Sequence, residues 1–244
     1  RNTIIGGLAG VALTTGQFNV ALGFNSLSSE DDHGRNTAIG TNTLQAQNAG
    51  ADAYNVAVGY DAGFSISTGT NNTIIGSLAG DALTTGSNNV ALGYAALSTD
   101  VLGSDNVAIG LQAMSATDNA RANIAIGFNT LQSLNYASLT YSHNIAIGFD
   151  TGKAMTTGTL NTLVGGLSGD ALTEGNSNTA VGYQSLTSET KGDRNVAIGF
   201  GTLSQQNNTS STDAYNVAVG YNAGTNVTTG VSNTFLGAQA GDAI

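Results

Sequence analysis

The sequence of 244 residues contains no proline, no cysteine and no tryptophan. Because proline cannot donate to a ladder of backbone hydrogen bonds, its absence suits a chain that is almost entirely strand and tight turn. Without cysteine the chain has no disulfide scaffold and no thiolate metal site, and cysteine usage does not reveal the compartment. No apolar run approaches about 18 residues and no signal-peptide pattern opens the chain, so we expect no membrane insertion by this segment.

Positive charge is also scarce: six lysines and arginines stand against sixteen aspartates and glutamates, for a net charge of −10. An acidic surface repels phosphate backbones, so we expect no nucleic-acid partner. The acids are scattered, with their densest group at Glu30-Asp31-Asp32, and the two histidines, His33 and His143, lie far apart in the chain. A hydrolase site needs two carboxyl groups about 5–10 Å apart. We therefore expect neither an enzyme nor a cofactor or metal site.

What the chain does have is a short repeat. An asparagine followed three residues later by Ile, Leu or Val, and then by Gly, occurs fourteen times, and ten of the thirteen intervals are 17 residues. The asparagines are Asn2, Asn19, Asn36, Asn55, Asn72, Asn89, Asn106, Asn123, Asn144, Asn161, Asn178, Asn195, Asn216 and Asn233. Such a period predicts an all-β fold, a parallel β-roll (β-solenoid) of about 14 coils. Residues 1–244 form one array that starts and stops inside a repeat, which indicates a segment of a longer fibrous protein.

The positions of a coil can be numbered from its asparagine, as position 1. Positions 2 and 4 are β-branched or aliphatic, position 3 is Ala in ten coils and position 5 is always Gly, as in 106–110 and 195–199. This alternation predicts a strand with positions 2 and 4 on one face and the small residues on the other. We expect the face of Ala108, Gly110, Ala197 and Gly199 to pack against the opposite wall of the coil or a neighbouring chain. The asparagines should form a ladder of side-chain amides.

Two further features vary between coils. Position 9 is Gly in seven coils and Leu or Met in the other seven. Three intervals are longer than 17 residues, and their extra length falls within Gln45–Tyr54, Gln132–His143 and Ser204–Tyr215. Loops on a rigid scaffold often carry recognition, although tolerance of insertions also explains them. The candidate receptor-binding residues are Tyr54, Tyr136, Tyr141, His143 and Tyr215.

The motif in Asp105-Asn106-Val107-Ala108-Ile109-Gly110 and in Arg194-Asn195-Val196-Ala197-Ile198-Gly199 resembles the YadA-like head repeat of trimeric autotransporter adhesins. Asn178-Thr179-Ala180-Val181-Gly182-Tyr183 is similar to repeats of bacteriophage tail fibres and marine bacterial surface proteins. The resemblance implies a left-handed roll, a homotrimer and an extracellular location, on a virion tail fibre or a bacterial cell surface. It also implies attachment to a glycan or protein receptor on a host.

Position 6 carries eight of the fifteen aromatic residues, on the face of positions 2 and 4. Packing in a core or interface explains such a column, and a row of rings that stack on sugars is the functional alternative. The leading hypothesis is thus a non-catalytic trimeric surface fibre for attachment, either a phage tail fibre shaft or a bacterial adhesin head. A purely structural spacer or matrix filament is the second hypothesis. An ice-binding solenoid is a third, although it would need Thr-x-Thr in nearly every coil.

Overall fold

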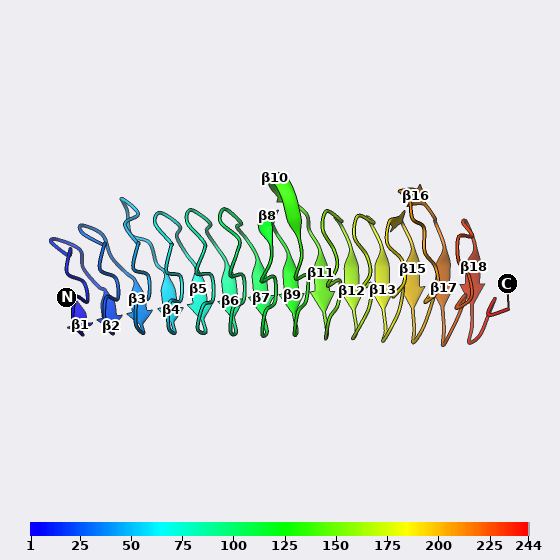
Figure 1. Ribbon diagram of the computed structural model, residues 1–244, viewed down its shortest axis with the longest axis horizontal. Coiled ribbons are helices and arrows are strands. Elements are labelled where there is room, and N and C mark those ends of the chain that lie inside the picture. Colours follow the sequence, from blue (N-terminus) through cyan, green and yellow to red (C-terminus); the bar gives the residue numbers. More distant parts are fainter. Residues whose placement is uncertain (244) are drawn as a thin grey trace. The chain divides into compact units, whose positions relative to one another are not determined.

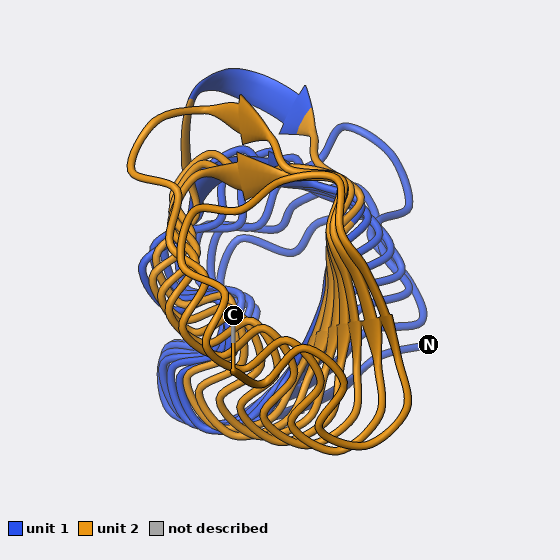
Figure 2. Cartoon of the chain, turned by 90° about the vertical axis from the view of Figure 1, so that its right-hand side faces the viewer, with its two compact units in different colours: residues 1–122, 137–140 blue, residues 123–136, 141–244 orange. Residues whose placement is uncertain are grey.

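The computed structural model describes residues 1–243, which form a parallel β-solenoid of about 14 coils. The chain divides into two compact units, which Figure 2 colours separately. Unit 1 comprises Arg1–Ala122 and Ala137–Thr140, and unit 2 comprises Asn123–Tyr136 and the residues from Tyr141 onward. No helix occurs in residues 1–243, so none there is long and apolar enough to cross a membrane.

Each unit contains seven parallel strands, one per coil (Figure 1). Those of unit 1 are β1 (Thr3–Ile5), β2 (Val20–Leu22), β3 (Thr37–Ile39), β4 (Val56–Val58), β5 (Thr73–Ile75), β6 (Val90–Leu92) and β7 (Val107–Ile109). Those of unit 2 are β9 (Ile124–Ile126), β11 (Ile145–Ile147), β12 (Thr162–Val164), β13 (Thr179–Val181), β15 (Val196–Ile198), β17 (Val217–Val219) and β18 (Thr234–Leu236). Every strand covers motif positions 2 to 4, and neighbours pair in register, for example Ala197 with Ala218. The predicted fold class is confirmed.

Four strands of other lengths lie outside this series: β8 (Asp118–Arg121), β10 (Asn135–Tyr141), β14 (Gly192–Asp193) and β16 (Thr212–Asp213). Two of them fall within the long intervals, which we expected to be loops. β10 occupies most of Gln132–His143, and β16 lies near the end of Ser204–Tyr215 and pairs in parallel with β14. The additional residues of these two intervals therefore extend the secondary structure instead of forming simple loops.

The asparagine ladder is present as predicted. In Asn161, which is fully buried, Oδ1 accepts hydrogen bonds from the backbone N–H (2.9 Å) and from Nδ2 (3.1 Å) of Asn178. Its own Nδ2 donates to the carbonyl of Gly175 (2.8 Å), which closes the turn of the same coil. One side chain thus satisfies backbone groups in two coils, and an unpaired buried group would otherwise cost roughly 1–3 kcal/mol. The ladder is a structural element, in keeping with the prediction.

The glycine at position 5 is required by its conformation and by the space around it. Gly199 has a φ of +133°, and a Cβ there would lie 2.4 Å from the carbonyl oxygen of Gly220 in the next coil. The same close approach recurs at Gly182, where the Cβ would lie 2.3 Å from the oxygen of Gly199. Any side chain would push successive coils apart, which explains why this column contains nothing but glycine.

The two kinds of coil solve one packing problem in two ways. Where position 9 is Gly, position 12 carries a large apolar side chain that fills the space over it; a Cβ at Gly169 would lie 2.9 Å from Cδ1 of Leu172. Where position 9 is Leu or Met, the side chain itself is buried, as at Leu186, and position 12 is mostly polar, as at Glu189. Six of the seven coils with Leu or Met at position 9 have a polar residue at position 12, whereas the coil of Asn123 buries Leu at both positions, Leu131 and Leu134. Comparing positions 9 and 12 across the printed sequence would have revealed this exchange.

The residue before each asparagine forms a corner of the coil. It has a positive φ in thirteen coils although it is never Gly, for example 63° at Arg35 and 50° at His143. A left-handed conformation costs a non-glycine residue about 1–2 kcal/mol. The corner leaves the following asparagine buried in the ladder, while the corner side chain itself is exposed at Tyr54, Leu160 and Tyr215.

Candidate functional site

The exposed face of the strands is apolar. Position 3 is buried in every strand except β1, whereas positions 2 and 4 are never buried. Ala108 and Ala197 are completely buried, and Leu92 and Ile198 are 42% and 38% exposed. Of the two environments expected for the alanine face, the opposite wall of the coil is confirmed and a neighbouring chain is wrong. The interior also takes larger side chains at position 3, since Ile74 and Leu163 are fully buried. The Val, Ile and Leu side chains at positions 2 and 4 point outward on the single chain.

The aromatic side chains at position 6, just after the strands, are exposed as well. The eight rings of this column, which are 39–56% exposed, are Phe24, Tyr60, Tyr94, Phe128, Phe149, Tyr183, Phe200 and Tyr221. In unit 2 neighbouring rings stack on one another, with centroids 5.4 Å apart for Phe128 and Phe149 and 5.7 Å for Tyr183 and Phe200. Stacked rings cover each other's faces. This favours packing of the column against another surface over sugar stacking along it.

The five candidate receptor-binding residues do not share one environment. Tyr54, His143 and Tyr215 are corner residues that directly precede a motif asparagine, so they belong to the regular coil and not to added loop. Tyr141 is 57% exposed and stacks against His143, with centroids 5.9 Å apart.

Tyr136 is 5% exposed, and its hydroxyl donates a hydrogen bond to the carbonyl of Gly158 (2.7 Å). The expectation that it contacts a receptor is wrong for this reason. Nothing in the local sequence shows that Tyr136 is buried while Tyr141 is exposed, because the long interval interrupts the repeat.

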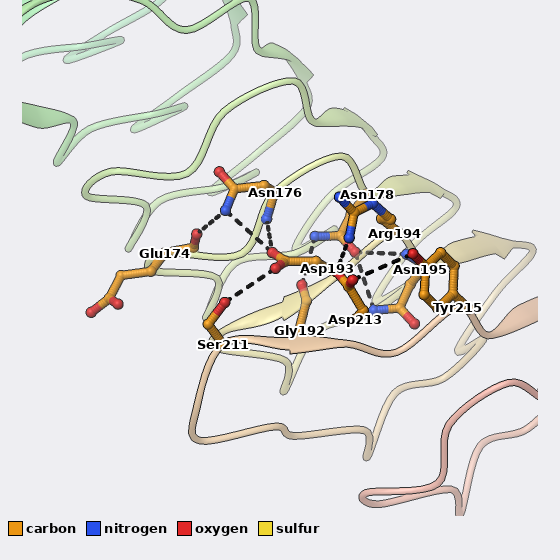
Figure 3. Close-up of polar contacts among 10 residues, drawn as sticks. All are labelled: Glu174, Asn176, Asn178, Gly192, Asp193, Arg194, Asn195, Ser211, Asp213 and Tyr215. Atoms are coloured by element: carbon orange, nitrogen blue, oxygen red, sulfur yellow. Dashed lines mark hydrogen bonds and ion pairs between the residues drawn. The ribbon is translucent and has the colours of Figure 1, made fainter.

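A polar cluster surrounds the end of the third long interval (Figure 3). Arg194 forms an ion pair with Asp213, and its guanidinium lies over the ring of Tyr215, 5.5 Å from the centroid. The Tyr215 hydroxyl donates to Oδ2 of Asp213 (3.3 Å). Side chains of this cluster are about half exposed, at 48% for Arg194 and 49% for Asp213.

The neighbouring Asp193 is occupied by the scaffold. Its Oδ1 accepts hydrogen bonds from the backbone N–H of Asn176 (2.6 Å) and from its Nδ2 (3.2 Å), and its Oδ2 accepts one from Ser211 (3.3 Å), as Figure 3 shows. Its role is to hold the turns together. The exposed groups available to a ligand in this region are thus Arg194, Asp213 and Tyr215.

The first long interval ends in a similar arrangement in unit 1, where the Arg35 guanidinium also lies over the ring of Phe18, 4.9 Å from the centroid. Arg35 Nε donates to Oδ2 of Asp52 (2.6 Å), and its guanidinium lies 5.6 Å from the ring centroid of Tyr54. The hydrogen bond to Asp52 raises the pKa of Arg35 above its ordinary value. A shallow pocket beside this arrangement is lined by Thr15, Gln17, Phe18, Asp32, Arg35 and Asp52. The two matching arrangements could have been recognised in the sequence from the tetrapeptide Asp-Ala-Tyr-Asn, which occurs at 52–55 and again at 213–216.

The buried acids are engaged with the turns. Glu189 is fully buried, and its Oε1 accepts backbone hydrogen bonds from Thr190 (2.9 Å), Gly192 (2.8 Å) and Asn208 (2.9 Å). Asp100 is also fully buried, and burial raises its pKa to about 6. Because these acids line the core, they do not present a catalytic carboxylate pair to a substrate.

Among residues 1–243, one group of three side chains has ligand atoms close enough to hold a cation. Glu30, Asp31 and His33 each offer an atom within 4.8 Å of the others. Glu30 is fully buried, burial raises its pKa, and its Oε2 already accepts a hydrogen bond from Nδ2 of Asn36 (3.3 Å). The group occurs in one coil only, so it supplies no ligand set that could recur along the repeat.

Threonine hydroxyls of the Thr-Thr-Gly turns also serve the scaffold. Thr84 Oγ1 donates to the carbonyl of Val101 (3.0 Å), and Thr156 Oγ1 donates to that of Thr173 (3.1 Å). Hydroxyls used between coils are not free to order water, which does not favour an ice-binding face.

In comparisons with known proteins, no protein-family model, curated protein or solved structure matches the chain. The fold places it in the class of parallel β-solenoids, and its function must be argued from its surface.

Proposed function

We propose that this chain is a non-catalytic segment of a trimeric attachment fibre, extracellular and displayed on a phage tail or a bacterial surface. The observation that carries the proposal is the set of exposed apolar side chains at positions 2, 4 and 6 in both units. Contiguous apolar patches of this kind are seldom left in water by soluble monomers. We infer that the same side chains of two further copies cover them.

The number of copies comes from the resemblance of the motif to the adhesin head repeat, whose chains assemble around one axis. The charged residues beside the strands are also consistent with an interface between chains. Interfaces bury apolar cores and keep charged groups at their rims, and the corner residues beside the strands include Arg35 and Arg194. A fibre of this kind supplies rigidity and reach, and the exposed clusters at the long intervals are its candidates for host contact.

The proposal is tested first by the oligomeric state. Sedimentation equilibrium at micromolar concentration should give three times the mass of one chain. Ile198→Glu places a charge on the exposed face and should dissociate the assembly, whereas Thr229→Glu, an exposed turn position in the same unit, should not. A well-folded wild-type monomer at this concentration would refute the trimer.

Attachment is tested separately, by the binding of the labelled intact protein to a panel of bacterial and eukaryotic cells. Binding to particular cells supports the attachment role. A stable trimer that binds none of them would instead support the spacer, in which the chain only extends the fibre.

A further inference from the structure

The same three-residue arrangement occurs once in each unit. Arg35, Asp52 and Tyr54 in unit 1 match Arg194, Asp213 and Tyr215 in unit 2: an ion pair joins the arginine to the aspartate, and the guanidinium lies over the tyrosine ring at 5.6 Å and 5.5 Å. We call each set an Arg–Asp–Tyr triad. In both, the arginine is the corner residue of one coil, and the aspartate and tyrosine precede the asparagine of the next.

The coil does not need these residue types. In other coils the corner position carries Phe18, Asn71, Asn88, Asp105, Ala122, His143, Leu160, Ser177 or Ser232, with the same positive φ. The triad side chains are also exposed: Tyr54 and Tyr215 are 52% and 50% exposed. Exposed ion pairs contribute only about 0–1 kcal/mol to stability. The recurrence of an intact triad is therefore not explained by folding.

The surroundings in unit 1 form a place for a ligand. Arg35 and Asp52 line the shallow pocket together with Thr15, Gln17, Phe18 and Asp32. The pocket thus has amide, carboxylate and guanidinium groups beside the ring of Phe18, while the Thr15 hydroxyl donates to Oδ1 of Asp32 (3.1 Å). Small sites that combine a few convergent polar groups with apolar surface are typical of ligand recognition.

The chemistry of the triad selects the class of ligand. Arginine and aspartate neutralise each other, and the chain as a whole carries a charge of −10, so an anion gains little here and is repelled overall. The carboxylate accepts hydrogen bonds, the guanidinium donates them and the tyrosine hydroxyl does both. Vicinal hydroxyls on a sugar ring match this set. We propose that each Arg–Asp–Tyr triad is a binding subsite for neutral saccharides, an inference that rests on the proposed attachment function.

The triads are compatible with the trimer. They lie at the corner beside the strand and carry charged groups, which belong to the rim of an interface and not to its apolar core. A saccharide can therefore reach them in the assembled fibre. Each chain would carry one triad in each of its units, and the trimer would therefore carry several copies. Weak binding at the individual subsites then adds up through multivalency.

The test is binding of the intact wild-type protein to a printed array of neutral oligosaccharides, with sialylated and sulfated ones beside them. Affinities for the best neutral oligosaccharide are then measured for Arg35→Ala, Arg194→Ala and the double variant. Lys191→Ala is the matched control, because Lys191 forms an exposed ion pair with Glu174 in unit 2 (2.7 Å) outside the triad. Tyr54→Phe and Tyr215→Phe keep the rings and remove only the hydroxyls.

We expect binding to neutral oligosaccharides, a loss of about tenfold or more in the double arginine variant, and no change in the control. The tyrosine variants should lose a smaller part of the affinity with an unchanged melting temperature. The inference is overturned if the array is silent, if the charged oligosaccharides bind best, or if the double variant binds like wild type. If the protein is a trimer that attaches to cells but binds no oligosaccharide on the array, only the saccharide inference is refuted. If it is a folded monomer that attaches to no cells, the proposed function itself is refuted.

Discussion

Asn161 Oδ1 accepts two hydrogen bonds from Asn178, one from its backbone N–H and one from its side-chain Nδ2. The contact joins residues 17 apart in sequence and recurs between other neighbouring motif asparagines of each unit, as between Asn72 and Asn89. Each coil is therefore positioned by the one before it through a side chain as well as through its strand.

Replacing Asn161 with alanine should lower the free energy of unfolding by about 2–4 kcal/mol. The change leaves the Asn178 N–H and the Gly175 carbonyl without their partner, and each unpaired buried group costs roughly 1–3 kcal/mol. Chemical denaturation of the intact protein measures the loss. Asn135→Ala, at an exposed position, is the control, and equal losses in the two variants would contradict the structural role of the ladder.

Gly199→Ala should destabilise much more than Gly237→Ala. Both residues are at position 5 with a left-handed φ, +133° and +118°, so the conformational strain is shared. At Gly199 the added Cβ also meets the Gly220 carbonyl oxygen at 2.4 Å, whereas nothing lies within 4 Å of it at Gly237. The difference between the two melting temperatures therefore measures the steric contact between coils. Similar losses would show that backbone strain alone selects glycine.

Gly169→Leu should destabilise the fold, and Leu172→Gln in the same chain should restore part of the loss. The single change adds a large side chain to a space that is already filled, since a Cβ at Gly169 would lie 2.9 Å from Cδ1 of Leu172 and 3.1 Å from Cδ2 of Leu163. Overpacking of a core costs about 1–3 kcal/mol. A double-mutant cycle from denaturation curves gives the coupling. Additive effects would contradict the exchange between positions 9 and 12.

Asp100→Asn should flatten the dependence of stability on pH. Burial raises the pKa of Asp100 to about 6, above the ordinary value of 3.8, so the folded state holds a proton that the unfolded state releases between these values. The free energy of unfolding therefore falls as pH rises through this window, by about 2–3 kcal/mol in total. Subtracting the stability profile of the variant from that of wild type isolates this carboxyl. A difference that does not change between pH 4 and pH 6 would refute the assignment.

Removing divalent metal ions should leave the melting temperature unchanged. The coils are held by backbone pairing and the asparagine ladder, and the group of Glu30, Asp31 and His33 occurs in a single coil. Thermal unfolding with and without EDTA tests this. A fall of many degrees would locate a structural cation, with this group as the first place to look.

The sequence was enough to predict the one strand in each coil, its register and the ladder, because motif asparagines such as Asn195 and Asn216 stand at the same phase of the repeat. It could not decide which strand face is inside. Ala197 and Ile198 are both apolar, so the alternation alone does not tell which of the two faces lines the interior. Tyr136 was misplaced because β10 lies where the repeat is interrupted. The triads were missed because their members belong to two adjacent coils, and only the repeated tetrapeptide marks them.

The in-register stacking has a mechanical consequence within each unit. Under tension along the stack, the boundaries between coils act as springs in series, so each carries the full load and the weakest one fails first. The asparagine ladder and the strand pairing repeat at boundary after boundary, as at Ala180–Ala197 and Ala197–Ala218, which spreads strength evenly. The pairing of β14 with β16 adds a second attachment across one long interval. Within each unit, resistance to tension is therefore set by the boundary that has the fewest such contacts.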